Sequence, residues 1–276
     1  MPFNADIAGT RWGPVDWQAT PRRVLAFRGV LAPDDAAGLD DAAGPLAMLP
    51  MQVVTPEWAL ALMSREDPRQ TLSADESRRG VHASQDSRFL RPVTAGETLT
   101  CEAELLGVRD SRAGAVSVIR YRSRVGGELV AESVSVSVMR GVAVSGGDRP
   151  VEIDEPAIAF EPVGVGERID TPRAFPHLYS ECADIWNPIH TERTVALAAG
   201  LPDILIHGTA LWALAGLRAA PPGASITRLA ARFRSPAWAG EPMWLEKGPV
   251  GGRTPFRLRA EDGRLLTEGF VEVAGP

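Results

Sequence analysis

The 276-residue sequence is 45% hydrophobic and 23% charged, and its formal net charge is −6. This composition is typical of a globular protein with a sizeable core and excludes a largely disordered chain. The acidic balance argues against a nucleic-acid surface, because phosphate binding requires concentrated Lys and Arg.

Targeting signals and cysteines indicate the compartment. The first twenty residues contain charges and prolines instead of a continuous apolar segment, and no apolar run approaches the roughly 18–20 residues of a membrane span. Cys101 and Cys182 are far apart and lack a CxxC partner, which predicts reduced thiols. We expect a soluble, cytoplasmic protein with neither a membrane nor a nucleic-acid partner.

The first half of the chain predicts one helix followed by a meander. Pro56–Ser64 is a weak helical segment. Polar and apolar residues then alternate with period 2, which predicts antiparallel strands. The strand segments are Thr98–Val108, Val116–Val125 and Leu129–Met139, with a turn at Gly126-Gly127. The stretch Val142–Pro156 is rich in Gly, Pro and Asp and predicts the join to the second half.

The second half predicts two helices and a second meander. Thr191 is the expected cap of a helix over Glu192–Ala199, with Gly200 as its stop. A longer apolar helix is expected over Thr209–Ala219. The strand segments that follow are Met243–Lys247, Pro255–Ala260 and Leu265–Val273.

The two meanders are introduced by the same motif. Arg88–Glu97 and Arg232–Glu241 both read RF-x-x-P-x-x-A-G-E, 144 residues apart. A second match, beginning at Gly127 and at Gly263, follows in the same order at an offset of 136 residues. An internal duplication is therefore predicted, in which two helix-wrapped sheets join edge to edge and so protect strands that would otherwise be exposed.

Three of the four histidines fall close together in the second half. Asn187-Pro188 disfavours helix and leaves His190 in a loop just ahead of one. His207-Gly208 again precedes a helix, where a glycine N–H can receive negative charge developing on an oxygen. A base beside such an N–H suits proton transfer next to a carbonyl. His82 and His177 are interpreted as structural.

The motifs around these residues resemble a known family. Tyr179 to Asn187-Pro188-Ile189-His190, then Ala199-Gly200-Leu201, then Ile206-His207-Gly208, look like the pattern of the MaoC-like, type 2 (R-specific) enoyl-CoA hydratases. The resemblance implies an α+β fold, the double hotdog, in which two helix-wrapped antiparallel sheets form a pseudo-dimer. Residues 1–145 would be a degenerate hotdog that houses the acyl tail, and residues 146–276 the hotdog with the active site.

The resemblance also implies a mechanism and a set of site residues. A His and an Asp activate one water, which adds across the C2=C3 bond of a trans-2-enoyl thioester, and the glycine N–H holds the thioester oxygen. His190 and Gly208 match the motif positions. Asp184 is the candidate for the carboxylate. The residues expected to border the substrate are Tyr179, Asn187, His207 and Thr209.

The carboxylate position departs from the family pattern. Five residues before His190, where the family has its catalytic Asp, this chain has Ile185. Asp184 keeps the family's spacing from Tyr179, so one inserted residue would restore the pair. Alternatively, Ile185 occupies the catalytic position and Asp184 faces solvent. Glu181 is a further candidate acid or base.

The predicted function is that of a lyase of fatty acid metabolism: reversible hydration of trans-2-enoyl thioesters, or dehydration of (R)-3-hydroxyacyl thioesters, carried on CoA or acyl carrier protein. No cofactor and no metal are expected. Because of Ile185, a non-catalytic acyl-thioester binder or a partner subunit of a hydratase complex is the alternative, and a hotdog thioesterase is a third. Either a monomer or a homodimer fits a double hotdog.

Overall fold

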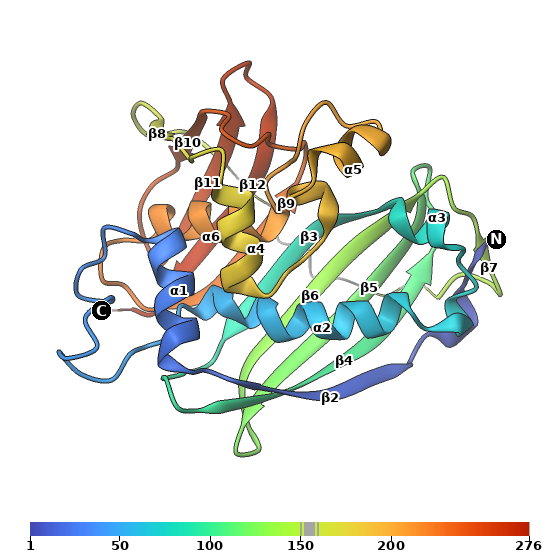
Figure 1. Ribbon diagram of the computed structural model, residues 1–276, viewed down its shortest axis with the longest axis horizontal. Coiled ribbons are helices and arrows are strands. Elements are labelled where there is room, and N and C mark those ends of the chain that lie inside the picture. The colour runs from blue at the N-terminus through green and yellow to red at the C-terminus, as the bar shows by residue number, and fades with distance from the viewer. Residues whose placement is uncertain (150, 152–157, 159, 276) are drawn as a thin grey trace.

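The computed structural model describes residues 1–149, 151, 158 and 160–275. Ten strands form one continuous sheet in the order β2-β4-β5-β6-β3-β9-β12-β11-β10-β8, and the two short strands β1 and β7 pair separately. The first five strands of the large sheet precede residue 141 and the other five follow residue 166 (Figure 1). The strands are β1 Phe3–Asn4, β2 Arg11–Gln18, β3 Gly80–Phe89, β4 Thr98–Arg109, β5 Gly114–Val125, β6 Glu128–Arg140, β7 Val144–Ser145, β8 Glu167–Ile169, β9 Ile226–Phe233, β10 Met243–Lys247, β11 Arg253–Ala260 and β12 Leu265–Val273.

The two meanders meet where β3 pairs with β9. These strands run antiparallel, from Ser84 opposite Arg232 to Arg88 opposite Arg228. Arg228 also forms a two-pronged ion pair with Asp86 of β3, with N···O distances of 2.9 and 2.6 Å. The edge-to-edge joining of two sheets is therefore confirmed, as is the α+β double hotdog class. The division at residues 145 and 146 stays a prediction, and residues 150 and 152–156 of the predicted join lie outside the described residues.

Helices cover one side of this sheet. The α-helices are α1 Pro21–Leu31, α2 Val54–Arg65, α3 Ala74–Arg78, α4 Phe175–Ala183, α5 Arg193–Ala198 and α6 Gly208–Ala219, and the 3-10 helices are η1 Ala5–Ile7, η2 Pro50–Val53, η3 Pro68–Gln70 and η4 Pro188–His190. Figure 1 shows α2 lying across the strands of the first meander and α6 against those of the second. These two are the helices that the duplication predicts, and α1 contacts both α4 and α6.

Helix α6 is made almost entirely of small and apolar residues because it is buried on nearly all sides. Trp212 is fully buried and its indole N–H donates to the carbonyl oxygen of Leu229 on β9 at 3.2 Å. A Cβ on Gly216 would lie 2.5 Å from the Leu229 side chain, so a glycine is required for this close approach. These contacts hold the middle of α6 closely against β9.

Some local predictions were wrong. Helix α5 begins one residue later than expected, with Glu192 and not Thr191 at the N-cap, and neither side chain caps it. Helix α4, which contains the start of the motif from Tyr179 to Ala183, was not predicted. No helix among the described residues is long and apolar enough to cross a membrane.

Candidate active site

His190 is the last residue of η4, and two contacts fix its loop. Asn187 caps η4 by accepting from the Ile189 N–H, and the His190 Nδ1–H donates to the carbonyl oxygen of Leu205 at 2.8 Å. This bond leaves Nε2 as the unprotonated ring nitrogen. Burial lowers the pKa of His190 to about 4, so the imidazole is neutral at pH 7 and able to accept a proton.

The imidazole of His207 packs against the imidazole of His190. The two rings are stacked with centroids 3.7 Å apart. Nε2 of His207 lies 3.3 Å from the carbonyl oxygen of Ile185 and 3.1 Å from the Ser180 hydroxyl. Burial lowers the pKa of His207 well below its usual value, and the nearby His190 lowers it further. Two stacked rings in this setting resist protonation, so His207 positions a neutral His190.

The Gly208 amide is the third component. Gly208 is the first residue of α6, and the amide N–H groups of a first helical turn have no intrahelical acceptor. His207, at the N-cap, makes no side-chain hydrogen bond to this turn. A Cβ at position 208 would lie 3.4 Å from the Phe233 ring. At its positive end the helix therefore presents an N–H that has no acceptor among the described residues, which suits an anionic oxygen.

A cavity of about 1190 Å³ joins these groups to the first meander. It is lined by five of the seven predicted site residues: Asn187, His190, His207, Gly208 and Thr209. Much of the remaining lining comes from α2, β3, β5 and β6 of the first half, and further parts come from residues 199–206 and 233–236 of the second half. The η4 loop and the start of α6 thus border the same cavity.

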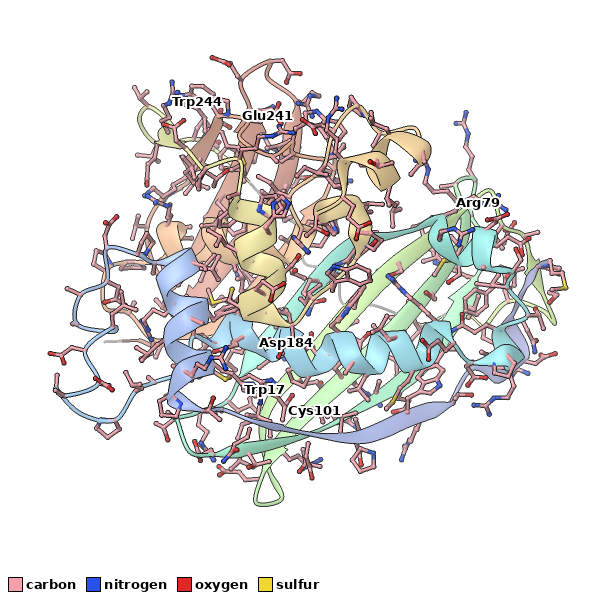
Figure 2. All side chains as sticks on the ribbon, in the orientation of Figure 1. Trp17, Arg79, Cys101, Asp184, Glu241 and Trp244 are labelled. Atoms are coloured by element: carbon pink, nitrogen blue, oxygen red, sulfur yellow. The ribbon has the colours of Figure 1, made fainter. Side chains whose placement is uncertain are left out.

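Asp184 is not part of this cavity. It lies just beyond the C-terminus of α4 in a left-handed conformation, with φ 51° and ψ 31° (Figure 2). Its side chain is 58% exposed and lies 3.9 Å from the guanidinium of Arg23 on α1. Ile185 follows it, is 5% exposed and lines the cavity. The structure therefore fits the alternative in which Ile185 occupies the carboxylate position, and the expectation that Asp184 assists His190 is corrected.

Two other candidates also lie away from the cavity lining. Tyr179 is fully buried in the core, with its ring 5.0 Å from that of His207. Glu181 is exposed on α4. His177 is exposed and hydrogen-bonds the carbonyl oxygen of Thr191 at 2.9 Å, which fits the structural interpretation.

The sequence missed the polar groups that the first meander contributes. His82, interpreted as structural, lines the cavity and lies 2.9 Å from the Ser135 hydroxyl. Glu57 on α2 accepts from the Gln85 amide at 3.0 Å, and burial raises its pKa to about 7. A glutamate on the face of α2 that turns toward the sheet was the available signal, because such a position is normally apolar.

Comparison with known proteins identifies the family. The FAS1-like dehydratase domain region matches residues 9–133. The 3-hydroxyacyl-thioester dehydratase Y of Mycobacterium tuberculosis is 32% identical over 217 residues, which are 71% of this chain and 73% of that protein. A MaoC-like dehydratase from Phytophthora capsici has a similar structure, with a TM-score of 0.79, 17% identity and coverage of 99% of this chain and 98% of the other. This chain belongs to the MaoC-like dehydratases.

The fold of this MaoC-like dehydratase is also found in more distant structures. A Mycobacterium tuberculosis protein described as having a double hotdog fold matches with a TM-score of 0.61 and 13% identity over 96% of both chains. At such low identity the likeness concerns the fold alone. The helix-covered double hotdog is thus shared.

Proposed function

We propose that this MaoC-like dehydratase hydrates trans-2-enoyl thioesters reversibly and, in the other direction, dehydrates (R)-3-hydroxyacyl thioesters. The relative named as a 3-hydroxyacyl-thioester dehydratase supports this reaction type. The observation that carries the proposal is that one cavity is lined both by a neutral His190, held through Nδ1 by the Leu205 carbonyl, and by Gly208 at the N-terminus of α6.

His190 moves the proton in this mechanism. Its Nε2 removes a proton from a water molecule as the water oxygen forms a bond to C3 of the substrate. The C2=C3 π electrons shift toward the thioester, which gives an enolate. The imidazolium then returns the proton to C2, so that one water has been added. Dehydration follows the same steps in reverse.

Gly208 stabilises the charge that develops on the thioester oxygen. Its N–H points from the positive end of α6, so it interacts more strongly with the enolate oxygen than with the neutral carbonyl. Only such a difference between transition state and ground state accelerates the reaction. His207 acts by holding the imidazole of residue 190 in place.

His190 performs both proton transfers in this proposal because Ile185 stands where a carboxylate would assist. The same isoleucine supports the second candidate, a protein that binds acyl thioesters without turning them over. The two are separated by incubating the purified protein with trans-2-enoyl-CoA thioesters of several chain lengths and following the loss of enoyl absorbance. Saturable binding without hydration in either direction would overturn the proposal in favour of the second candidate, and release of free CoA would point to a thioesterase.

The pH profile should carry the signature of His190. Because burial lowers its pKa to about 4, the base stays neutral down to that range, and kcat/KM should show no protonation step near the usual histidine pKa of 6.5. The profile should be measured in wild type and in Glu57→Gln, because Glu57 lines the same cavity and burial raises its pKa to about 7. A fall in kcat/KM centred near pH 6.5 in both proteins would contradict the assignment. Circular dichroism at each pH would exclude unfolding as the cause.

A further inference from the structure

One ring nitrogen of His207 has no hydrogen-bond partner within the described part of the chain. His207 is 2% exposed and lines the cavity, and the unpaired nitrogen is its buried Nδ1. Among the described residues that line the cavity, no other has a buried side-chain nitrogen or oxygen without a partner. Buried polar groups in native proteins nearly always have a partner, so this nitrogen indicates a position that a substrate group or a reacting water completes.

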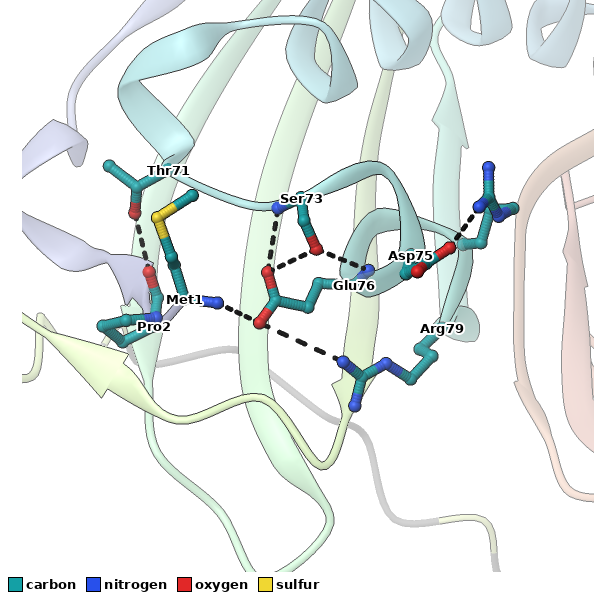
Figure 3. Close-up of polar contacts among 8 residues, drawn as sticks. Met1, Pro2, Thr71, Ser73, Asp75, Glu76 and Arg79 are labelled. Carbon is teal, nitrogen blue, oxygen red and sulfur yellow. Dashed lines mark hydrogen bonds and ion pairs between the residues drawn. The ribbon is translucent and has the colours of Figure 1, made fainter.

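Other polar groups around the cavity are paired within the protein. Beside α3, the Glu76 carboxylate lies 4.0 Å from the guanidinium of Arg79 and also pairs with the chain terminus (Figure 3). Nε2 of His82 lies 2.9 Å from the Ser135 hydroxyl. At these positions the protein itself supplies the hydrogen-bond or ion-pair partner. Nδ1 of His207 differs from them in this respect.

The second ring nitrogen determines the tautomer of His207. Nε2 lies 3.3 Å from the carbonyl oxygen of Ile185, and a carbonyl oxygen only accepts hydrogen bonds. Nε2 therefore carries the hydrogen of the neutral ring, and the Ser180 hydroxyl oxygen, 3.1 Å away, can accept from the same N–H. Nδ1 is then an unprotonated acceptor. The group that completes it must be a hydrogen-bond donor, which a water molecule or a hydroxyl group is.

This acceptor lies close to the proposed base. The rings of His207 and His190 are stacked, with centroids 3.7 Å apart and an angle of 19° between their planes. Because each ring atom lies about 1.2 Å from its centroid, Nδ1 of His207 and Nε2 of His190 are at most about 6 Å apart, which a water oxygen with hydrogen bonds of about 2.9 Å to both would span. The two nitrogens are thus close enough to share one water molecule.

We propose that Nδ1 of His207 accepts a hydrogen bond from the water that His190 activates and, in the dehydration direction, from the 3-hydroxyl group of the substrate. This inference rests on the proposed function and adds a second catalytic residue to it. During hydration the water oxygen bonds to C3 and loses one proton to His190, while its other O–H stays intact and donates to His207. This hydrogen bond strengthens as the water oxygen becomes more positive in the transition state, so it accelerates the reaction.

The inference explains how the site can work without a carboxylate at position 185. In the pattern that the sequence resembles, a His and an Asp both act on the water, and the side chain of isoleucine cannot accept a hydrogen bond. The backbone carbonyl of Ile185 instead holds His207 in the tautomer whose Nδ1 accepts. The residue that replaces the carboxylate therefore orients the group that takes over its hydrogen bond.

Leucine and asparagine at position 207 form a matched pair of test variants. The two side chains are similar in size and shape, but only asparagine has an acceptor at the δ position. Both variants lose the ring stack with His190 and the bond to Ile185, so their difference isolates the acceptor. His207→Asn should hydrate the preferred enoyl-CoA with a kcat about tenfold or more above that of His207→Leu. The saturated acyl-CoA of the same chain length does not add water, so its inhibition constant should agree within about twofold between the variants.

His207→Gln provides a further variant in case leucine prevents folding. Its amide at the ε position can still donate to the Ile185 carbonyl, but it offers no acceptor at the δ position. Its kcat should therefore fall about tenfold or more below that of wild type. Thermal melting of each variant would verify that it is folded.

Three results would contradict the inference. Equal kcat values in His207→Asn and His207→Leu would show that the δ acceptor has no part in the reaction. A difference between them that appeared equally in the inhibition constant of the saturated acyl-CoA would show that Nδ1 shapes the substrate pocket and does not act on the reacting water. Failure of wild type to hydrate enoyl-CoA of any chain length would remove the proposed function itself, and this inference with it.

Discussion

His190→Ala is expected to lower kcat for enoyl-thioester hydration by about 10³-fold, because the substitution removes the group that both takes and returns the proton. His190→Asn provides a better-packed second variant, since its side-chain amide can still donate a hydrogen bond near the Leu205 carbonyl that Nδ1 contacts. Both should lose turnover while retaining substrate binding, which can be followed by equilibrium titration with a saturated acyl-CoA.

Asp184→Asn is the matched control for His190. Asparagine tolerates the left-handed conformation that residue 184 adopts, so the backbone is not strained. The variant loses only an exposed ion pair with Arg23, which contributes little to stability. Its kcat should remain within about twofold of wild type. A loss of activity in Asp184→Asn as large as in His190→Ala would restore the carboxylate to the mechanism.

Gly208→Pro is expected to lower kcat by about 10²–10³-fold, because proline lacks the N–H that receives the charge of the enolate oxygen. The backbone at this position accepts proline. Residue 208 is the first of α6, where proline is favoured, and His207 before it has φ −59° and ψ 137°, which suits a residue preceding proline. The loss of activity should therefore exceed any loss of stability.

Gly208→Ala separates the missing N–H from crowding. Alanine keeps the N–H and adds a Cβ that would lie 3.4 Å from the Phe233 ring, so a smaller effect, less than about tenfold in kcat, is expected from misplacement of the substrate. Steady-state kinetics and melting temperatures of the two variants should be compared. Equal losses of kcat in Gly208→Ala and Gly208→Pro would assign the effect to sterics and contradict the role of the amide.

The sequence predicted the repeated elements best, since their pattern occurs twice. The limits of β10 and β12 were correct to the residue, and those of β4 to β6 to within two. Strand β2 was missed because its register against β4 shifts between Trp12 and Val15, which interrupts the alternation that reveals a strand. Short-range periodicity is informative only where the pairing is regular.

In the site, the motif residues could be predicted from the sequence, but which of their side chains face the cavity could not. His190 and Gly208 lie on one cavity as expected. The residue spacing within the motif left open whether Asp184 or Ile185 faces the cavity. In the structure Asp184 adopts the left-handed conformation at the end of α4, and Ile185 faces the cavity. Glu57 and Arg65 reach the cavity from a helix more than 120 residues earlier in the chain, a long-range contact that no local pattern encodes.

The two halves of the chain, which join where β3 pairs with β9, supply different functional parts of one cavity. The residues that transfer protons and hold the thioester belong to η4 and α6 in the second half of the chain, whereas the lining supplied by the first half belongs largely to α2, β3, β5 and β6. Changes that alter which acyl groups are admitted can therefore accumulate on one side without disturbing the chemistry on the other. Such independence would allow relatives with the same fold to differ in substrate selectivity while they catalyse the same reaction. It would also allow the cavity lining from the first half of the chain to be redesigned without changing the residues that transfer protons.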